Sequence, residues 1–300
     1  MKNSIKISAC IITYNHEAYI KDCLEGAISQ ILNCEYEIVI GEDFSTDATL
    51  EICKEYAEKY PNLIRLLPRE KNLGMMGNWM ETLKDCQGKY IALCEGDDYW
   101  TDPLKLQKQV DFLEENEDYV LCFHKVDILK PSGEIVEDFI TNVPKNYESI
   151  STLARFGNYI HTPSVVYRNI LNSVPFELKE APFGDFFLYM MLAQHGNLYY
   201  IKEVMGVYRY NVGVISNMSE INIANNNVKL YSCMFSYFDN EELKKIILER
   251  QIEVVTRHYN LIHSKYSNYF VSNHLVFRLF KFFKINYKNP KKILAKLRNK

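Results

Sequence analysis

Short apolar runs alternate with amphipathic segments along the first 125 residues of the chain. The runs are typical of strands buried on both faces, whereas apolar residues that recur every three or four positions are typical of helices. Strands are expected at Ile5–Thr13, Tyr36–Gly41, Leu63–Leu67, Tyr90–Cys94 and Val120–Phe123. Helices are expected at Ala18–Ile31, Ala48–Lys59 and Asn78–Cys86, and again after Pro103. Repeated strand–helix–strand units predict an α/β fold with a mostly parallel, twisted sheet and helices on both faces.

The pattern is less regular after residue 126. Lys130–Gly133 predicts a turn, which we expect to join the two strands of a hairpin. A helix is expected at Phe183–Ala193 and a strand at Leu198–Tyr208. A further helix is expected from Glu241 to His263, where apolar residues recur seven positions apart. The C-terminal part of the chain is therefore predicted to be helical.

Composition narrows the class of protein. The 300 residues are 47% hydrophobic and 13% aromatic, which supports a sizeable core and excludes a disordered or collagen-like chain. No apolar run reaches the length of about 20 residues that a transmembrane helix needs. Met1–Asn15 is interpreted as a buried strand rather than a signal peptide, because no small-residue cleavage site follows its apolar run. No pair among the eight cysteines has C-x-x-C spacing, so we expect reduced thiols in the cytoplasm and no zinc site.

Charge is distributed unevenly along the chain. Residues 271–300 contain nine Lys or Arg and no Asp or Glu, although the whole chain has a formal net charge of −3. The apolar residues of this tail that fall on one helical stripe are Leu275, Val276, Leu279, Phe280 and Phe283. A basic amphipathic helix is typical of binding to an anionic membrane surface, and packing on the rest of the protein is the alternative. Nucleic acid is not expected as a partner, because no recognition module accompanies the charge.

Polar clusters lie at the ends of the predicted strands. Thr13–Asn15 follows the first strand, Glu42–Asp47 the second and Glu95–Asp98 the fourth, while Asn72–Gly74 lies between the third and the fourth. Taken singly, each cluster is explained as a helix cap or a solvated turn. Because the carboxyl ends of parallel strands meet at one edge of a sheet, we expect the clusters to converge there. Their convergence favours a ligand site over four unrelated turns.

The chemistry of these clusters indicates a metal and a nucleotide. Adjacent carboxylates repel one another and remain ionised most easily beside a cation. Hard oxygen ligands suit Mg²⁺ or Mn²⁺, and a divalent ion beside a tyrosine and a separate aspartate suits a nucleoside diphosphate. The chain has neither a G-x-x-x-x-G-K-[ST] loop nor a G-x-G-x-x-G loop after the first strand. A P-loop or a dinucleotide-binding domain is therefore not expected.

Together the motifs resemble those of family 2 glycosyltransferases, which have the A-type nucleotide-sugar-binding fold. The runs that carry the resemblance are Ile11–Asn15, Gly41–Asp47, Asn72–Gly74, Glu95–Gln107, His161–Arg168, Phe183–Asp185 and Val207–Arg209. The resemblance covers roughly residues 4–216. It implies a catalytic domain over 1–216, with a nucleotide-binding half over 1–125 and an acceptor half over 126–216. Residues 217–300 would form a helical extension that ends in the basic tail.

The resemblance also implies roles for individual residues. Those that would bind the nucleotide are Thr13, Tyr14, Asn15, Asp43, Asn72, Gly74 and Asp97. Asp98 and Asp97 would bind Mn²⁺ or Mg²⁺, Asp43 would accept a hydrogen bond from the base, and Asp185 would be the general base. The residues that would line the cleft for the acceptor or the donor sugar are Glu95, Trp100, His161 and Arg209, with packing in the core as the alternative for Trp100. Two positions depart from the family, since Glu95 stands where Asp is usual and Asn211 stands where His is usual.

The function that this resemblance implies is metal-dependent, inverting sugar transfer in surface polysaccharide biosynthesis. The donor would be a nucleotide sugar, UDP-linked, and the acceptor a glycan or a lipid-linked molecule. Two alternatives are a nucleotidyltransferase of the same fold and a catalytically degenerate domain that binds a glycan. Ala9–Glu17 lacks the Gly-rich basic loop of the first, and intact Asp43, Asp97, Asp98 and Asp185 argue against the second. We expect a cytoplasmic protein that its tail places on the inner face of the cell membrane.

The basic tail generates the first testable prediction. Each Lys or Arg near an anionic bilayer contributes about 1 kcal/mol to binding, and apolar side chains that enter the interface add to this. We expect the full chain to float with anionic liposomes more than with neutral ones, and a chain that ends at Ser272 to lose this preference. Raised salt should weaken the binding, because exposed charges are screened over about 8 Å at physiological ionic strength. Equal flotation of the two chains would show that the tail does not bind membranes.

Overall fold

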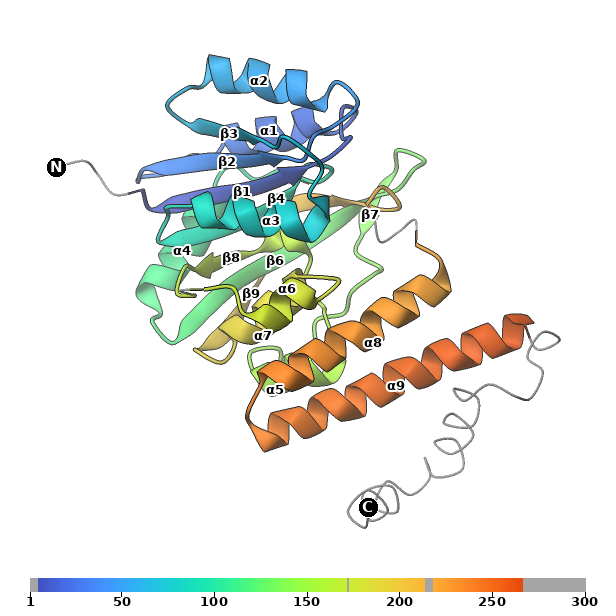
Figure 1. The fold of residues 1–300 in the computed structure, drawn as a ribbon. Helices are drawn as coiled ribbons and strands as arrows, with labels where there is room; N and C mark the ends of the chain where they lie inside the picture. Colours follow the sequence, from blue (N-terminus) through green and yellow to red (C-terminus); the bar gives the residue numbers. More distant parts are fainter. Residues whose placement is uncertain (1–4, 172, 214–217, 267–300) are drawn as a thin grey trace, which may run out of the picture. The chain divides into compact units, whose positions relative to one another are not determined.

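A computed structural model describes residues 5–171, 173–213 and 218–266 of the chain (Figure 1). The chain divides into two compact units, residues 1–254 and residues 255–300. Helix α8 (Glu220–Tyr237) belongs to the first unit, and the catalytic-domain boundary expected at residue 216 stays a prediction. The basic tail predicted at 271–300 lies outside the described residues. No helix in the described ranges has both the length and the apolar character needed to cross a membrane.

The first unit is built on one mixed sheet with the strand order β3-β2-β1-β4-β8-β6-β9-β5, and β7 pairs with β6. The strands are β1 (Ile7–Thr13), β2 (Tyr36–Glu42), β3 (Ile64–Pro68), β4 (Tyr90–Glu95), β5 (Tyr99–Trp100), β6 (Tyr119–Leu129), β7 (Ile135–Glu137), β8 (Val166–Arg168) and β9 (Asn197–Arg209). β1 is a central strand of the parallel part of the sheet, because it pairs in parallel with both β2 and β4. The α/β architecture predicted from the sequence is confirmed, and so is the hairpin, in which β6 and β7 are antiparallel.

Helices cover both faces of the sheet. The helices are α1 (Ile20–Ile28), α2 (Thr49–Lys59), α3 (Gly74–Asp85), α4 (Lys105–Glu115), α5 (Ile150–Phe156), the 3₁₀ turn η1 (Thr162–Ser164), α6 (Phe176–Glu180), α7 (Asp185–Leu192), α8 and α9 (Glu241–Tyr266). One buried cluster joins the sheet to α1, α2 and α4, and the other joins it to α3, α5, α7 and α8. β1 feeds both clusters, since Ile7, Ala9 and Ile11 face one and Cys10 the other.

The fifth predicted strand is not the neighbour of β4, because the three-residue strand β8 lies between β4 and β6. β8 is antiparallel to both neighbours, and Val166 and Tyr167 are buried in opposite core clusters. So short a strand has no alternating pattern that the sequence could reveal. Since β8 runs opposite to β4, the segment before β8 lies beside the carboxyl end of β4. This brings His161 and η1 to the edge where the polar clusters gather.

Helix α3 starts four residues before its predicted start at Asn78 and packs tightly against β2. Its first turn contains Gly74 and Gly77, whose low helix propensity conceals the helix in the sequence. The Asn78 amide donates to the carbonyl oxygen of Gly41 over 2.8 Å, and Arg69 donates to the side chains of Asn78 and Thr82. This network fixes α3 against the end of β2, from which Asp43 extends.

Gly41 tests this packing. A Cβ atom added at Gly41 would lie 1.9 Å from Thr82 Oγ1, so Gly41→Ala forces α3 away from the sheet. We expect the free energy of unfolding to fall by about 1–3 kcal/mol, as is typical of overpacking. Urea denaturation would measure this, and adding Thr82→Ala should make the double variant more stable than the sum of the two single effects predicts. Gly41→Ala with wild-type stability would show that α3 is not held so closely.

Candidate active site

The first cavity, of ≈ 300 Å³, lies beyond the carboxyl ends of β1, β2 and β4. The residues predicted for the nucleotide that line it are Thr13, Tyr14, Asp43, Asn72, Gly74 and Asp97. Thr13 is buried, whereas Tyr14 is 40% exposed. The structure therefore brings together six of the seven residues predicted to bind the nucleotide, although they come from four separate segments of the chain.

Asp43 is held at the wall of this cavity by the loop before α3. The Leu73 N–H donates to Asp43 Oδ1 over 2.7 Å, and the Asn72 amide donates to the Asp43 carbonyl oxygen over 3.1 Å. Asn72 in turn accepts a hydrogen bond from the Gly74 N–H. Burial raises the pKa of Asp43, and the N–H groups of Leu73 and Gly74 partly offset this rise. The carboxylate is thus fixed by main-chain donors, an arrangement suited to accepting a hydrogen bond from a ligand.

Asn15, the seventh residue predicted for the nucleotide, does not line the cavity. It has the left-handed φ of 53°, which Asn tolerates better than most residues. Its side chain accepts a hydrogen bond from the Thr46 N–H over 2.9 Å, and its own N–H donates to Ser45 Oγ over 3.0 Å. Asn15 therefore ties the loop after β1 to the loop after β2. The motif identified an important position, but its role in the structure is to join the two loops.

The acidic cluster stands at the end of β4. Carboxylate oxygens of Glu95, Asp97 and Asp98 lie within 4.8 Å of one another. Glu95 and Asp97 line the first cavity, whereas Asp98 is only 1% exposed and is not part of its wall. Burial raises the pKa of Glu95 to about 8, and the negative charges of Asp97 and Asp185 add to the rise. Burial and the charges of Asp97 and Glu95 likewise raise the pKa of Asp98.

Asp98 has one satisfied and one unsatisfied oxygen. Its Oδ1 accepts a hydrogen bond from the Arg209 N–H over 2.8 Å, while its Oδ2 is buried without a hydrogen-bond partner among the described residues. A buried carboxylate oxygen without a partner is costly, and a cation would remove both that cost and the repulsion within the cluster. Three carboxylates supply the hard oxygen ligands that Mg²⁺ and Mn²⁺ prefer. The residues present therefore fit a divalent metal.

Arg209 supports this cluster from behind, so the expectation that it lines the cleft is wrong. It is 7% exposed and borders neither of the two cavities at this edge. Its Nη1 donates to the Asp97 carbonyl oxygen over 2.6 Å, and its Nη2 pairs with the Asp22 carboxylate. The guanidinium also lies 4.8 Å from the centre of the Tyr99 ring. Arg209 thus holds the main chain that presents the three carboxylates.

Of the two places expected for Trp100, the cleft and the core, the structure shows the core. It is 3% exposed, its Nε1 donates to the Pro163 carbonyl oxygen over 2.8 Å, and Lys105 Nζ lies 4.2 Å from the ring centre. Burial lowers the pKa of Lys105 to about 7. The bond to Pro163 joins β5 to the η1 segment, so Trp100 fixes the position of the cavity wall without lining either cavity.

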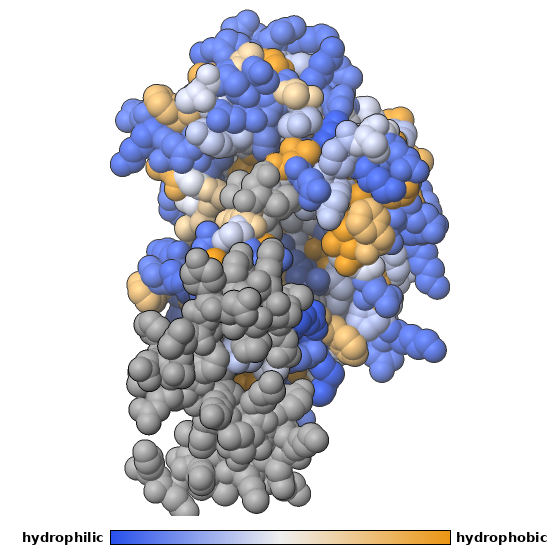
Figure 2. All heavy atoms as spheres, turned by 90° about the vertical axis from the view of Figure 1, so that its right-hand side faces the viewer, coloured by the Kyte–Doolittle hydropathy of each residue, from blue (hydrophilic) through white to orange (hydrophobic). Residues whose placement is uncertain are grey.

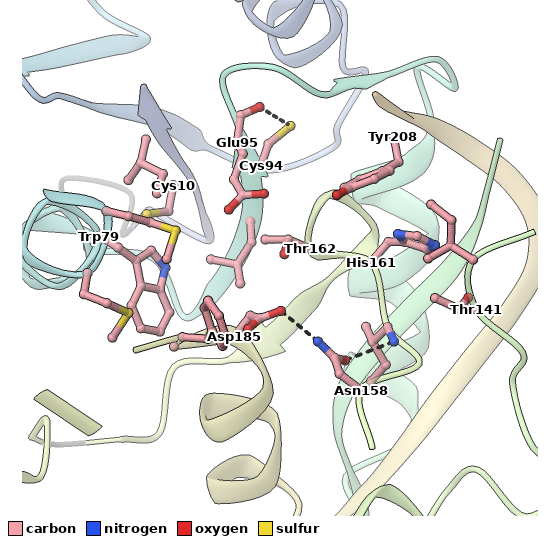
Figure 3. A pocket seen from close by; sticks show the side chains of 18 residues that line it. Cys10, Trp79, Cys94, Glu95, Thr141, Asn158, His161, Thr162, Asp185 and Tyr208 are labelled. Atoms are coloured by element: carbon pink, nitrogen blue, oxygen red, sulfur yellow. Dashed lines mark hydrogen bonds between the residues drawn. The ribbon is translucent and has the colours of Figure 1, made fainter. Parts of the chain in front are cut away.

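A second cavity, of ≈ 240 Å³, shares Glu95 and Tyr208 with the first (Figure 3). Asp185, the first residue of α7, lines it together with His161. The Asn158 amide donates to Asp185 Oδ2 over 2.8 Å. Burial raises the pKa of Asp185, and hydrogen bonds from the Phe186 N–H and from Asn158 partly offset the rise. A carboxylate with a raised pKa in a cavity is suited to taking up a proton.

His161 lines the second cavity as expected, and it is paired with Asp138, a residue that no sequence motif indicated. His161 Nε2 lies 3.0 Å from Asp138 Oδ2, and Asp138 also accepts hydrogen bonds from the Ile140 N–H and from Thr141. Burial alone would raise the pKa of Asp138, but the bonds from His161 and Thr141 hold it well below its usual range. The segment after β7 is thereby fixed beside the cavity, which Ile140 and Thr141 line.

The outer surface near β7 is mainly polar. Figure 2, seen from the side on which β7 lies in Figure 1, shows apolar patches separated by hydrophilic surface. Phe139 and Ile140, which follow β7, are exposed, and the Phe139 ring packs edge-on against Tyr210 at 5.3 Å between ring centres. Exposed Phe139 and Ile140 therefore form an apolar patch beside the second cavity, which Ile140 lines.

Comparison with known proteins agrees with this geometry. A family model described as glycosyl transferase family 2 matches residues 8–173. An uncharacterised protein of Mycobacterium tuberculosis strain H37Rv is 39% identical over 204 residues, which are 68% of this chain and 58% of that protein. The poly(ribitol-phosphate) beta-glucosyltransferase of Bacillus spizizenii is 37% identical over 97 residues, which are 32% of this chain and 15% of that protein. The chain thus spans 58% of the length of the mycobacterial relative.

Solved structures share the fold. TarS 1–349 of S. aureus in complex with UDP-GlcNAc has a TM-score of 0.58 at 20% identity, over 87% of this chain and 73% of that one. The mannosyltransferase PcManGT of Pyrobaculum calidifontis, in complex with GDP-Man and Mn²⁺, has a TM-score of 0.62 at 13% identity, over 99% of this chain and 85% of that one. Because the family model covers more than half of the sequence, the chain belongs to glycosyl transferase family 2.

Proposed function

We propose that the chain is a metal-dependent, inverting glycosyltransferase that takes a sugar from a UDP-linked donor. The observation that carries this proposal is the pair of adjoining cavities that share Glu95. Asp43 faces the first cavity, Asp185 faces the second, and Glu95 of the acidic cluster lines both. A donor in the first cavity would present its sugar toward the second, where an acceptor hydroxyl could meet Asp185.

Asp43 supports binding of a nucleotide donor in the first cavity. A carboxylate held by main-chain N–H groups can accept a hydrogen bond from the N–H of a pyrimidine or purine base. Thr13 and Tyr14 lie beside it in the same cavity. UDP is favoured because TarS was solved with UDP and with UDP-GlcNAc, although PcManGT was solved with GDP-Man. A nucleotide-sugar donor is consistent with both.

Asp98, Asp97 and Glu95 would hold Mn²⁺ or Mg²⁺. When bound, such an ion neutralises negative charge on the leaving diphosphate. Arg209 fixes the chain at Asp97 and Asp98, so these carboxylates are held in position for an ion. The Glu95 carboxylate belongs to the same group of oxygens, so the Glu found where the family usually has Asp still reaches the cluster.

Asp185 would act as the general base. An acceptor hydroxyl loses its proton to the Asp185 carboxylate while its oxygen attacks the anomeric carbon from the face opposite the leaving diphosphate. Burial favours this role, because a carboxyl whose pKa is raised binds a proton more strongly. Asp185 lies at the start of α7, whose remaining residues are all buried, so a rigid element carries it.

The acceptor is proposed from the relatives and from the tail. Poly(ribitol-phosphate) beta-glucosyltransferase is named for action on a polymer, which supports a role in polysaccharide synthesis. A lipid-linked acceptor and a position on the inner face of the cell membrane would explain the basic residues of 271–300. An enzyme held at that surface meets a membrane-bound acceptor at high local concentration.

Asp98→Asn tests the metal site. Asn keeps an oxygen that can accept the Arg209 N–H but removes the negative charge, so Mn²⁺-dependent binding of UDP should weaken by about 100-fold or more. Isothermal titration calorimetry with Mn²⁺ and with EDTA measures the metal-dependent part. Asp111→Asn, on the exposed side of α4, is the matched control and should bind like wild type. Unchanged Mn²⁺-dependent affinity in Asp98→Asn would rule out this metal site.

Asp185→Asn tests the base. The substitution removes the proton acceptor at almost constant volume, so sugar transfer should fall by about 10²–10⁴-fold. Binding of the donor should remain, because Asp185 does not line the first cavity. Donors would first be found by a screen of nucleotide sugars for metal-dependent thermal stabilisation, and transfer would then be followed by nucleotide release. If Asp185→Asn turns over at near the wild-type rate, Asp185 only caps α7.

A further inference from the structure

We propose that Asn158 is a positioning residue for Asp185, which it holds in the orientation needed to receive the acceptor proton. The inference rests on the proposed function, because it takes Asp185 as the base. Asn158 lies between α5 and η1, 27 residues before Asp185, and both side chains line the second cavity. Figure 3 shows the two side chains pointing toward one another.

The amide of Asn158 is fixed at both ends. Its Oδ1 accepts a hydrogen bond from the Ile160 N–H over 3.1 Å, and its Nδ2 donates to Asp185 Oδ2 over 2.8 Å. The reverse orientation would aim Nδ2 at an N–H group and Oδ1 at a carboxylate, so neither bond could form. Asn158 therefore presents a donor to Asp185 and restrains rotation of the carboxylate.

The segment that carries Asn158 is itself anchored. Gly157 has the left-handed φ of 81°, which lets the chain turn directly after α5. Arg250 Nη2 in α9 donates to the Phe156 carbonyl oxygen over 2.9 Å, and Tyr159 OH donates to the Tyr147 carbonyl oxygen over 2.7 Å. Bonds on both sides of Asn158 thus set its position. Helix α9 takes part in placing the base, although it lies beyond the part of the chain that resembles the family.

Removing the donor should change how Asp185 titrates. The bond from Asn158 stabilises the charged form of Asp185, so its loss raises the pKa. The other ionisable groups that face Asp185 or line its cavity are Glu95, His161, Tyr189, Tyr208 and the thiols of Cys10 and Cys94. Activity that needs ionised Asp185 will therefore appear only at a higher pH when the bond from Asn158 is removed.

Two substitutions separate the donor from the structural support. In Asn158→Asp, one carboxylate oxygen can still accept from the Ile160 N–H, but the side chain places a negative charge against Asp185 in place of a donor. In Asn158→Ala both bonds are lost. We expect the acid limb of the kcat/KM profile to move up by about one pH unit in Asn158→Ala and further in Asn158→Asp. At neutral pH kcat should fall by about tenfold in Asn158→Ala, with little change in KM for the donor.

The measurement has two parts, and the first needs no activity. The ¹³C resonance of the Asp185 carboxyl, assigned by its absence in Asp185→Asn, is titrated in the ligand-free full chain. The second is the pH profile of nucleotide release from the nucleotide sugar found in the thermal screen. Asn169→Ala is the control, because the Asn169 amide donates to the Gly88 carbonyl oxygen away from both cavities. It should titrate and turn over like wild type.

The outcomes distinguish this inference from the proposed function. An upward shift of the Asp185 titration in both variants, larger in Asn158→Asp, supports the positioning role. A wild-type titration in Asn158→Asp would overturn it, because that variant keeps the bond from the Ile160 N–H but replaces the donor to Asp185 with a negative charge. If Asp185→Asn also loses transfer in that case, the proposed function stands without Asn158. If wild type releases no nucleotide from any donor but the Asp185 titration still shifts in the variants, the proposed function is wrong. The hydrogen bond from Asn158 to Asp185 is then confirmed independently of it.

Discussion

Three carboxylates within 4.8 Å of one another, at the end of a buried strand, are the constraint on which the rest of the structure depends. Such a group repels itself, and burial increases the cost because little water remains to screen it. The raised pKa values of Glu95 and Asp98 are the direct consequence. Arg209 compensates in part by binding the main chain of the cluster, but it leaves Asp98 Oδ2 without a partner among the described residues. A divalent cation would complete this arrangement.

The sheet topology places the linings of two different cavities at the same edge of the sheet. β1, β2 and β4 are parallel, so the loops at their carboxyl ends form the first cavity. β8 runs antiparallel beside β4, which places the segment before it, with His161, at the second. The bond from Trp100 to Pro163 joins the two sides. One strand of opposite direction therefore places a second cavity beside the first at the same edge of the sheet.

The sequence predicted the parallel half of the sheet well, because buried strands and amphipathic helices have distinct periods. It also predicted that Asp43, Asp97 and Asp98 would gather at one edge, whereas Asp185 was identified only through the resemblance to the family. It could not distinguish residues that line a cavity from residues that fix the cavity wall in place, because a motif can contain residues of both kinds. Trp100 is of the second kind, and its place in the core depends on a bond to Pro163, 63 residues away. Asn158 gave no signal, because its role depends on a long-range contact.

The proposed function requires that the acidic cluster hold a divalent cation beside the diphosphate of a nucleotide in the first cavity. Anomalous X-ray diffraction from crystals grown with Mn²⁺ and UDP would test it most directly. We expect one manganese peak in contact with carboxylates of the Glu95–Asp98 cluster and with the diphosphate, and the base of UDP beside Asp43. A manganese peak elsewhere, or UDP bound in the first cavity with no metal at the cluster, would contradict it.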